Sequence, residues 1–186
     1  MSPKSRPVED ANVAVTLIVK GDKLLVVYNP QWGAFSLPMT KVKKWVYPGE
    51  DVSRSESWRR AGARAAAEWL GRTCRPPPRK VMDVPEWTAS FGVDDSVQES
   101  GREPVIKRYH YRVFLYALPA GGHVMPGALC EWLTTKELLD EDREPISPTA
   151  RDLIRKLGVA GEMEKPGQSA LGYCIDMAAK DPGGPE

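Results

Sequence analysis

The sequence predicts a mixed α/β domain, and three observations support this prediction. Apolar, β-branched runs typical of strands recur along the chain, beginning with residues 13–19 and 24–28. One Ala-rich segment, residues 55–70, has the composition of a helix in the middle of the chain. A second helical segment follows late, at residues 148–157. Strands on both sides of one central helix indicate an α/β or α+β domain.

The N-terminal third reads as a tail and a strand hairpin. Residues 1–11 are polar and contain two prolines, so they are predicted to be a flexible tail. Residues 13–19 form the first buried strand, and a tight turn at 20–23 leads into the returning strand at 24–28. Residues 39–55 are basic and then turn-like, with no strand predicted there.

The central helix is predicted from its composition and its ends. Gly71 is a natural stop after residues 55–70, and Ser53 with Glu56 three positions later has the spacing of a capping box. The proline run at 75–79 cannot be helical and therefore leads the chain away from the helix.

The remaining elements are strands near 79–91, 105–118 and 129–133, followed by two helices. Thr134 or Thr135 caps the first of these, and Pro148 opens the second. The domain organisation that follows is a tail at 1–11, one domain at 12–158 and a C-terminal extension at 159–186, whose order the sequence does not indicate.

Composition narrows the class of protein. The 186 residues include 26 Lys or Arg and 25 Asp or Glu, so the formal net charge is +1 and nucleic acid is not indicated as a partner. No apolar run approaches the roughly 18 to 20 residues of a membrane-spanning helix, and no secretory signal is recognisable, so no membrane partner is expected. Three widely spaced cysteines fit neither a zinc site nor a disulfide framework, which favours a reducing, cytoplasmic setting.

A particular order of motifs carries a family resemblance. A strand hairpin is followed by Trp32-Gly33-x-x-Ser36-Leu37-Pro38, and later by Glu56, seven residues and then Arg64. Glu131-Trp132-Leu133-Thr134 then precedes a short helix. In this order and spacing, residues 12–157 resemble the Nudix (MutT-like) hydrolase family. The signature of that family reads G, five residues, E, seven residues, R-E-U-x-E-E-x-G-U, where U is apolar.

The helical half of the signature is matched only in part. Glu68 and Gly71 stand where the first glutamate of the E-E pair and the closing glycine belong. Ala65 replaces the glutamate after the arginine, Trp69 replaces the second glutamate of the pair, and Arg72 replaces the final apolar residue. The signature is therefore degenerate.

The resemblance implies a fold and a chemistry. The fold is an α/β/α sandwich with a mixed sheet, one central helix after the loop and a C-terminal helix. The reaction is attack of water on a diphosphate linked to another group, assisted by Mg²⁺ or Mn²⁺, which bind carboxylate oxygens. The resemblance assigns Glu56, Arg64 and Glu68 to the catalytic site and Glu68 to the metal. Arg64 is expected to hold the loop to the helix.

The missing carboxylates predict weak or absent hydrolysis. Positions 65, 68 and 69 are spaced three and four residues apart, so a complete signature would place three carboxylates on one helix face. A methyl group, one carboxylate and an indole are a poor cage for a catalytic cation. Mg²⁺ or Mn²⁺ is therefore expected only if the family activity survives, and otherwise no cofactor. Glu68 can equally be a solvated helix carboxylate. Trp69 either packs against the core or a loop, or provides a platform on which a nucleotide base stacks.

Two sources of replacement carboxylates remain open. The stretch from Thr40, in the place of the signature glycine, to Glu56 is longer than the signature allows. Pro48-Gly49-Glu50 resembles the usual turn of the family, so Glu50 can take the first glutamate's role in a second alignment. The acidic loop at 94–103 supplies four further carboxylates, from Asp94, Asp95, Glu99 and Glu103.

Three function hypotheses follow. In the first, the chain binds a nucleotide or another phosphorylated small molecule, with Lys41, Lys43 and Lys44 contacting phosphate. In the second, the chain is an active hydrolase that uses replacement carboxylates. In the third, it is a non-catalytic module that contacts a protein partner. The first is the preferred hypothesis, although these lysines also fit a merely solvated basic face, and the sequence does not indicate the oligomeric state.

Overall fold

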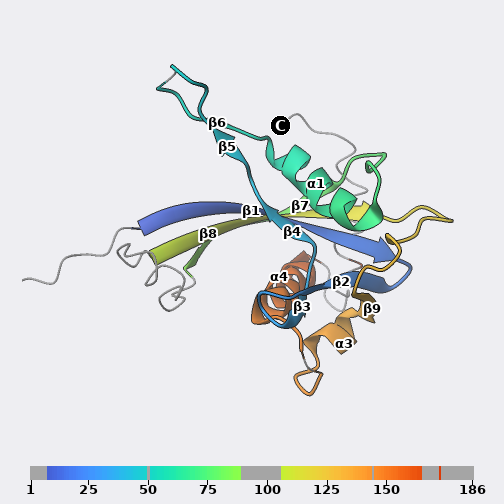
Figure 1. Cartoon of the computed structure of the whole chain (residues 1–186). Helices are drawn as coiled ribbons and strands as arrows, with labels where there is room; N and C mark the ends of the chain where they lie inside the picture. Colours follow the sequence, from blue (N-terminus) through green and yellow to red (C-terminus); the bar gives the residue numbers. More distant parts are fainter. Residues whose placement is uncertain (1–7, 50, 89–105, 144, 165–171, 173–186) are drawn as a thin grey trace, which may run out of the picture.

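The computed structural model describes residues 8–49, 51–88, 106–143, 145–164 and residue 172. Its elements, labelled in Figure 1, are β1 (Val8–Lys20), β2 (Lys23–Asn29), β3 (Ala34–Ser36), β4 (Met39–Lys41), β5 (Lys44–Trp45), β6 (Arg54–Ser55), α1 (Trp58–Leu70), β7 (Arg79–Thr88), β8 (Ile106–Ala117), β9 (Cys130–Thr134), α3 (Thr135–Leu139) and α4 (Pro148–Glu164).

β1 is the central strand of a mixed seven-stranded sheet of order β3-β2-β1-β8-β7. It pairs with β8 in parallel, from Val8 opposite Ile106 to Val19 opposite Ala117. It pairs antiparallel with β2 at one end and with the short β4 in its middle. β9 adds to β2 on that side of the sheet. β5 and β6 form a separate two-stranded sheet.

Side chains of β1 alternate between two buried faces. Val15 and Leu17 face the cluster that contains α4 residues Leu153, Ile154 and Leu157. The other face carries Ile18 in a cluster with Ala66 and Leu70 of α1, and Ala14 in a cluster with Ala61. Helices therefore cover both faces of the sheet, as Figure 1 shows, and the expected α/β/α sandwich is confirmed.

Three local predictions require correction. Residues 8–11, predicted to belong to the tail, are the first part of β1, because pairing with β8 supplies hydrogen bonds that their polarity does not reveal. α4 continues to Glu164, beyond the predicted end at 157. The basic segment before α1 contains the short strands β4, β5 and β6, where no strand was predicted.

One of the predicted helix caps is wrong and another is confirmed. α1 begins at Trp58, and its N-cap is Ser57, whose side chain accepts a hydrogen bond from the Arg60 backbone N–H. The predicted capping box of Ser53 and Glu56 is therefore wrong. Thr134 does cap α3, in a complete capping box with Glu137.

No helix in the described part of the chain is long and apolar enough to cross a membrane.

Candidate functional site

α1 lies unusually close to the sheet at Gly62. A Cβ added to this glycine would lie 2.8 Å from the Phe114 ring, and the Thr16 hydroxyl in β1 donates a 2.8 Å hydrogen bond to the Gly62 carbonyl. α1 ends where Gly71 adopts a left-handed conformation with φ of 61°. These contacts fix the depth and direction of the helix that carries the candidate residues.

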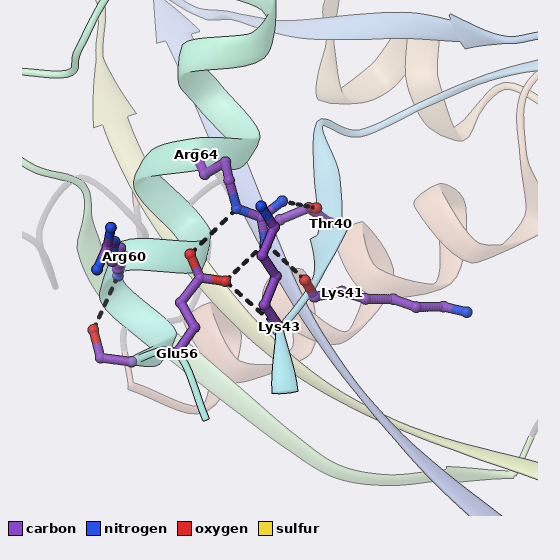
Figure 2. Close-up of polar contacts among 7 residues, drawn as sticks. Thr40, Lys41, Lys43, Glu56, Arg60 and Arg64 are labelled. Atoms are coloured by element: carbon purple, nitrogen blue, oxygen red, sulfur yellow. Dashed lines mark hydrogen bonds and ion pairs between the residues drawn. The ribbon is translucent and has the colours of Figure 1, made fainter. Parts of the chain in front are cut away.

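Arg64 of α1 binds two segments that precede the helix. Its Nε and Nη2 donate to the two carboxylate oxygens of Glu56 at 3.2 and 2.8 Å. Its Nη1 donates to the Thr40 hydroxyl at 2.7 Å, and Nη2 also donates to the Lys41 carbonyl at 2.8 Å. Figure 2 shows Glu56 between Arg64 and the backbone of Lys43, whose N–H donates to Oε2 at 3.2 Å. The arrangement ties β4 and the loop to α1.

The electrostatics of this network stabilise an ionised Glu56. The carboxylate side chain is only 5% exposed, and burial alone would raise its pKa. The hydrogen bonds from Arg64 outweigh burial, and with the Lys43 N–H and the positive charge of Arg64 they hold the pKa of Glu56 below its ordinary value. Both carboxylate oxygens already accept hydrogen bonds, so Glu56 is poorly placed to bind a metal ion or activate water.

The three signature positions of α1 have different environments. Ala65 is fully buried where α1 packs on the sheet. Trp69 is half-buried and packs against the cluster that contains Ile18 and Tyr116. Glu68 is exposed. One helix side therefore carries apolar groups that pack into the core, and a single carboxylate lies on its solvent side.

The described donors do not fit a catalytic divalent cation. Among the described residues, no group of three or more His, Cys, Asp or Glu side chains is placed to hold a metal ion. Glu68 alone supplies one carboxylate, whereas Mg²⁺ and Mn²⁺ sites in phosphate chemistry rely on several oxygen ligands. Glu50 and the 94–103 loop, the two predicted sources of replacement carboxylates, lie outside the described residues.

The three predicted phosphate-binding lysines are exposed and lie just before α1. Lys41 ends β4, Lys43 follows it and Lys44 begins β5. Figure 2 shows the Lys41 side chain extending away from the Glu56–Arg64 pair. Their roles, like the catalytic roles assigned to Glu56, Arg64 and Glu68, stay predictions.

The structure adds features that sequence reasoning missed. The β5–β6 hairpin is one of them, although the Pro48-Gly49 turn between Trp45-Val46-Tyr47 and Val52 is a hairpin signal in retrospect. The Arg112 guanidinium lies 4.8 Å from the centre of the Trp58 ring, a cation–π contact between β8 and the start of α1 that no local pattern indicates.

Of the comparisons with known proteins, the one with solved structures finds similar proteins. No family model matches the sequence, and no curated protein is significantly similar to it. The MutT Nudix hydrolase from Burkholderia pseudomallei superposes with a TM-score of 0.50 at 19% identity, covering 77% of this chain and 95% of that one. The ORF135 protein of E. coli superposes with a TM-score of 0.52 at 18% identity, covering 87% of this chain and 96% of that one. Together with the order of the strands and the packing of α1 on one face of the sheet, this structural similarity establishes that the chain has the Nudix hydrolase fold.

Proposed function

We propose that this chain is a Nudix-fold protein with a diverged metal site, which binds a nucleotide or another phosphorylated small molecule and hydrolyses it weakly or not at all. The observation that carries the proposal is the environment of three positions on α1. Ala65 is fully buried, Trp69 packs into the core, and only Glu68 offers a carboxylate to solvent. Losing even supporting groups around a metal typically costs about 10- to 100-fold in metal affinity or activity, and loss of direct ligands costs more.

Charge at the start of α1 supports binding of an anionic ligand. Lys41, Lys43 and Lys44 are exposed, while the nearby carboxylate of Glu56 is neutralised by Arg64. The electrostatic potential around the segment before α1 is therefore positive, although the net charge of the chain is only +1. Ammonium groups bind phosphate as point charges without needing a fixed geometry.

Hydrolysis is tested with a panel of nucleoside diphosphate-linked compounds in the presence of Mg²⁺ or Mn²⁺. We expect a kcat far below roughly 1 s⁻¹, which is the lower end of the usual range for enzymes. Turnover near or above that rate contradicts the loss of activity, and would favour the second hypothesis, in which Glu50 or the 94–103 loop supplies the missing carboxylates.

Binding is tested with ADP, without added metal, by isothermal titration calorimetry. The wild-type chain is expected to bind ADP. Replacement of Lys41, Lys43 and Lys44 by alanine removes the charges proposed to contact phosphate, and it is expected to weaken binding at least about tenfold, a loss of about 1.4 kcal/mol in binding free energy. The matched control replaces Lys20 and Lys23 by alanine, two exposed lysines at the ends of β1 and β2. Equal loss in both variants, or no binding to the wild type, contradicts the proposal.

A further inference from the structure

The segment between β4 and α1 exposes a concentration of apolar side chains. Trp45, Val46, Tyr47 and Val52 have exposed fractions of 38, 55, 49 and 68%. We call these four residues the hairpin patch. The described part of the chain contains eight exposed large hydrophobic residues, and half of them lie in this short stretch. Isolated exposed apolar residues are ordinary, but a cluster marks a surface that another molecule covers.

The patch is carried on a projecting element. Within the part of the chain that the structure describes, β5 and β6 pair with each other alone, through Lys44 opposite Ser55 and Trp45 opposite Arg54. Figure 1 shows this hairpin extending away from the main sheet, beyond the start of α1. Among the described residues, its apolar side chains therefore belong to none of the buried clusters of the sandwich.

The base of the hairpin is fixed to the folded core. The Glu56 N–H donates to the Lys43 carbonyl at 2.8 Å, and the Lys43 N–H donates back to the Glu56 carboxylate. Arg64 holds that carboxylate from α1. Nearer the tip, the Arg54 guanidinium lies 5.0 Å from the centre of the Tyr47 ring. A surface held in place before binding loses less conformational entropy when a partner docks.

The charges around the patch indicate the polarity of the partner. Lys43 and Lys44 are exposed and flank the base of the hairpin, whereas Asp51 is exposed near its turn. The base is thus positive, so a complementary partner carries carboxylates at the rim of the contact.

The apolar side chains indicate the class of partner. Tryptophan, tyrosine and arginine are the residue types that dominate binding energy at protein interfaces, and Trp45, Tyr47 and Arg54 are neighbours here. Val46 and Val52 neither stack on bases nor bind phosphate, so their burial requires an apolar surface. We infer that the hairpin patch docks into an apolar groove, rimmed by carboxylates, on a partner protein.

The experiment selects phage-displayed random 16-residue peptides on the immobilised full-length chain. Enriched peptides are expected to combine Asp or Glu with large apolar residues. Synthetic versions are then titrated by fluorescence anisotropy. Trp45→Ser and Tyr47→Ser are each expected to weaken binding at least about 30-fold, which corresponds to the roughly 2 kcal/mol of an interface hot spot. Affinity is also expected to fall as salt rises from about 0.05 to 0.5 M.

The matched control is Trp32→Ser, which makes the same substitution at a tryptophan that is 51% exposed but lies between β2 and β3. It is expected to leave peptide affinity unchanged, and circular dichroism establishes that each variant is folded. No enrichment, enrichment of peptides without acidic residues, or equal affinity for all variants overturns the inference. Binding of single-stranded oligothymidine or phosphatidylserine vesicles that Trp45→Ser abolishes, in place of peptide binding, also overturns it. ADP binding by Trp45→Ser reports separately on the proposed function.

Discussion

Arg64 joins α1 to the two segments before it through four hydrogen bonds, to Glu56, Thr40 and the Lys41 carbonyl. Replacing Arg64 by methionine keeps most of the aliphatic stem but leaves the buried carboxylate with only the Lys43 N–H. Removing one partner of a buried ion pair costs about 3 to 5 kcal/mol, and because the Arg64 side chain is 32% exposed we expect about 2 to 3 kcal/mol. Urea denaturation measures the loss in free energy of unfolding.

Arg60→Met is the control for this prediction. Arg60 is exposed on the first turn of α1, so the same substitution is expected to change the free energy of unfolding by less than about 0.5 kcal/mol. Equal losses at the two positions would mean that the network does not hold the loop.

Glu56 gives the fold a pH dependence of defined sign. Its folded-state pKa is lowered from 4.5 by the hydrogen bonds of Arg64, so the folded state binds a proton less readily than the unfolded state. Its stabilising effect is fully present above about pH 4.5 and is lost as pH falls through the lower folded-state value. The stability difference between the wild type and Glu56→Gln should therefore be constant from about pH 7 to 5 and shrink at lower pH.

Urea titrations of both proteins at several pH values measure this difference, and other carboxyl groups cancel because both proteins contain them. A difference that grows as pH falls below 4.5 would show the opposite sign and would contradict the assigned pKa direction.

At the scale of elements, the packing of α1 on the sheet depends on the missing side chain of Gly62. Gly62→Ala gains helix propensity of about 1 kcal/mol, but the new methyl group would lie 2.8 Å from the buried Phe114 ring. Overpacking of a core typically costs about 1 to 3 kcal/mol, so a net destabilisation is expected by thermal unfolding. In a Phe114→Leu background the same change should cost less, and an equal cost there would refute the clash.

The connection between α3 and α4 depends on Arg151. Its guanidinium donates to the carbonyls of Leu138, Asp140 and Arg143, which lie at and after the end of α3. Arg151→Met should destabilise the fold by about 1 to 2 kcal/mol, because three carbonyl groups, two of them in partly buried hydrogen bonds, lose their donor. Arg155→Met one turn later removes only an exposed pair with Glu141 and should cost less than about 1 kcal/mol in the same urea assay.

Elements with strong local signals were predictable from the sequence. The apolar runs of β1 and β2, the Ala-rich helix with Gly71 after it, and Thr134 as a cap all reflect local chemistry. The first residues of β1 were not predictable, because Val8–Ala11 become a strand only by pairing with β8 nearly a hundred positions away. β5 and β6 are two residues each, too short for a periodic pattern.

At the scale of the whole molecule, the candidate site was predictable only in its spacing. The family resemblance implied that Arg64 holds the loop to the helix, and in the structure Arg64 forms an ion pair with Glu56 of that loop. Burial was not predictable, since a helical wheel places positions 65, 68 and 69 on one side without saying where the sheet lies. Packing against β1, β4 and β8 buries Ala65 and leaves Glu68 in solvent.

The response of the whole fold to divalent cations follows from this carboxylate shortage. A ligand that binds only the folded state at 100 times its Kd stabilises that state by about 2.7 kcal/mol, which raises the Tm of a domain of this size by roughly 5 to 10 °C. With one exposed carboxylate at the signature positions, Mg²⁺ or Mn²⁺ at about 10 mM should shift the Tm by less than about 1 °C relative to NaCl of equal ionic strength. A rise of several degrees that Glu68→Gln removes would place a working metal site at α1. The same rise in Glu68→Gln itself would mean that other acidic groups bind the ion, and either result would contradict the diverged site.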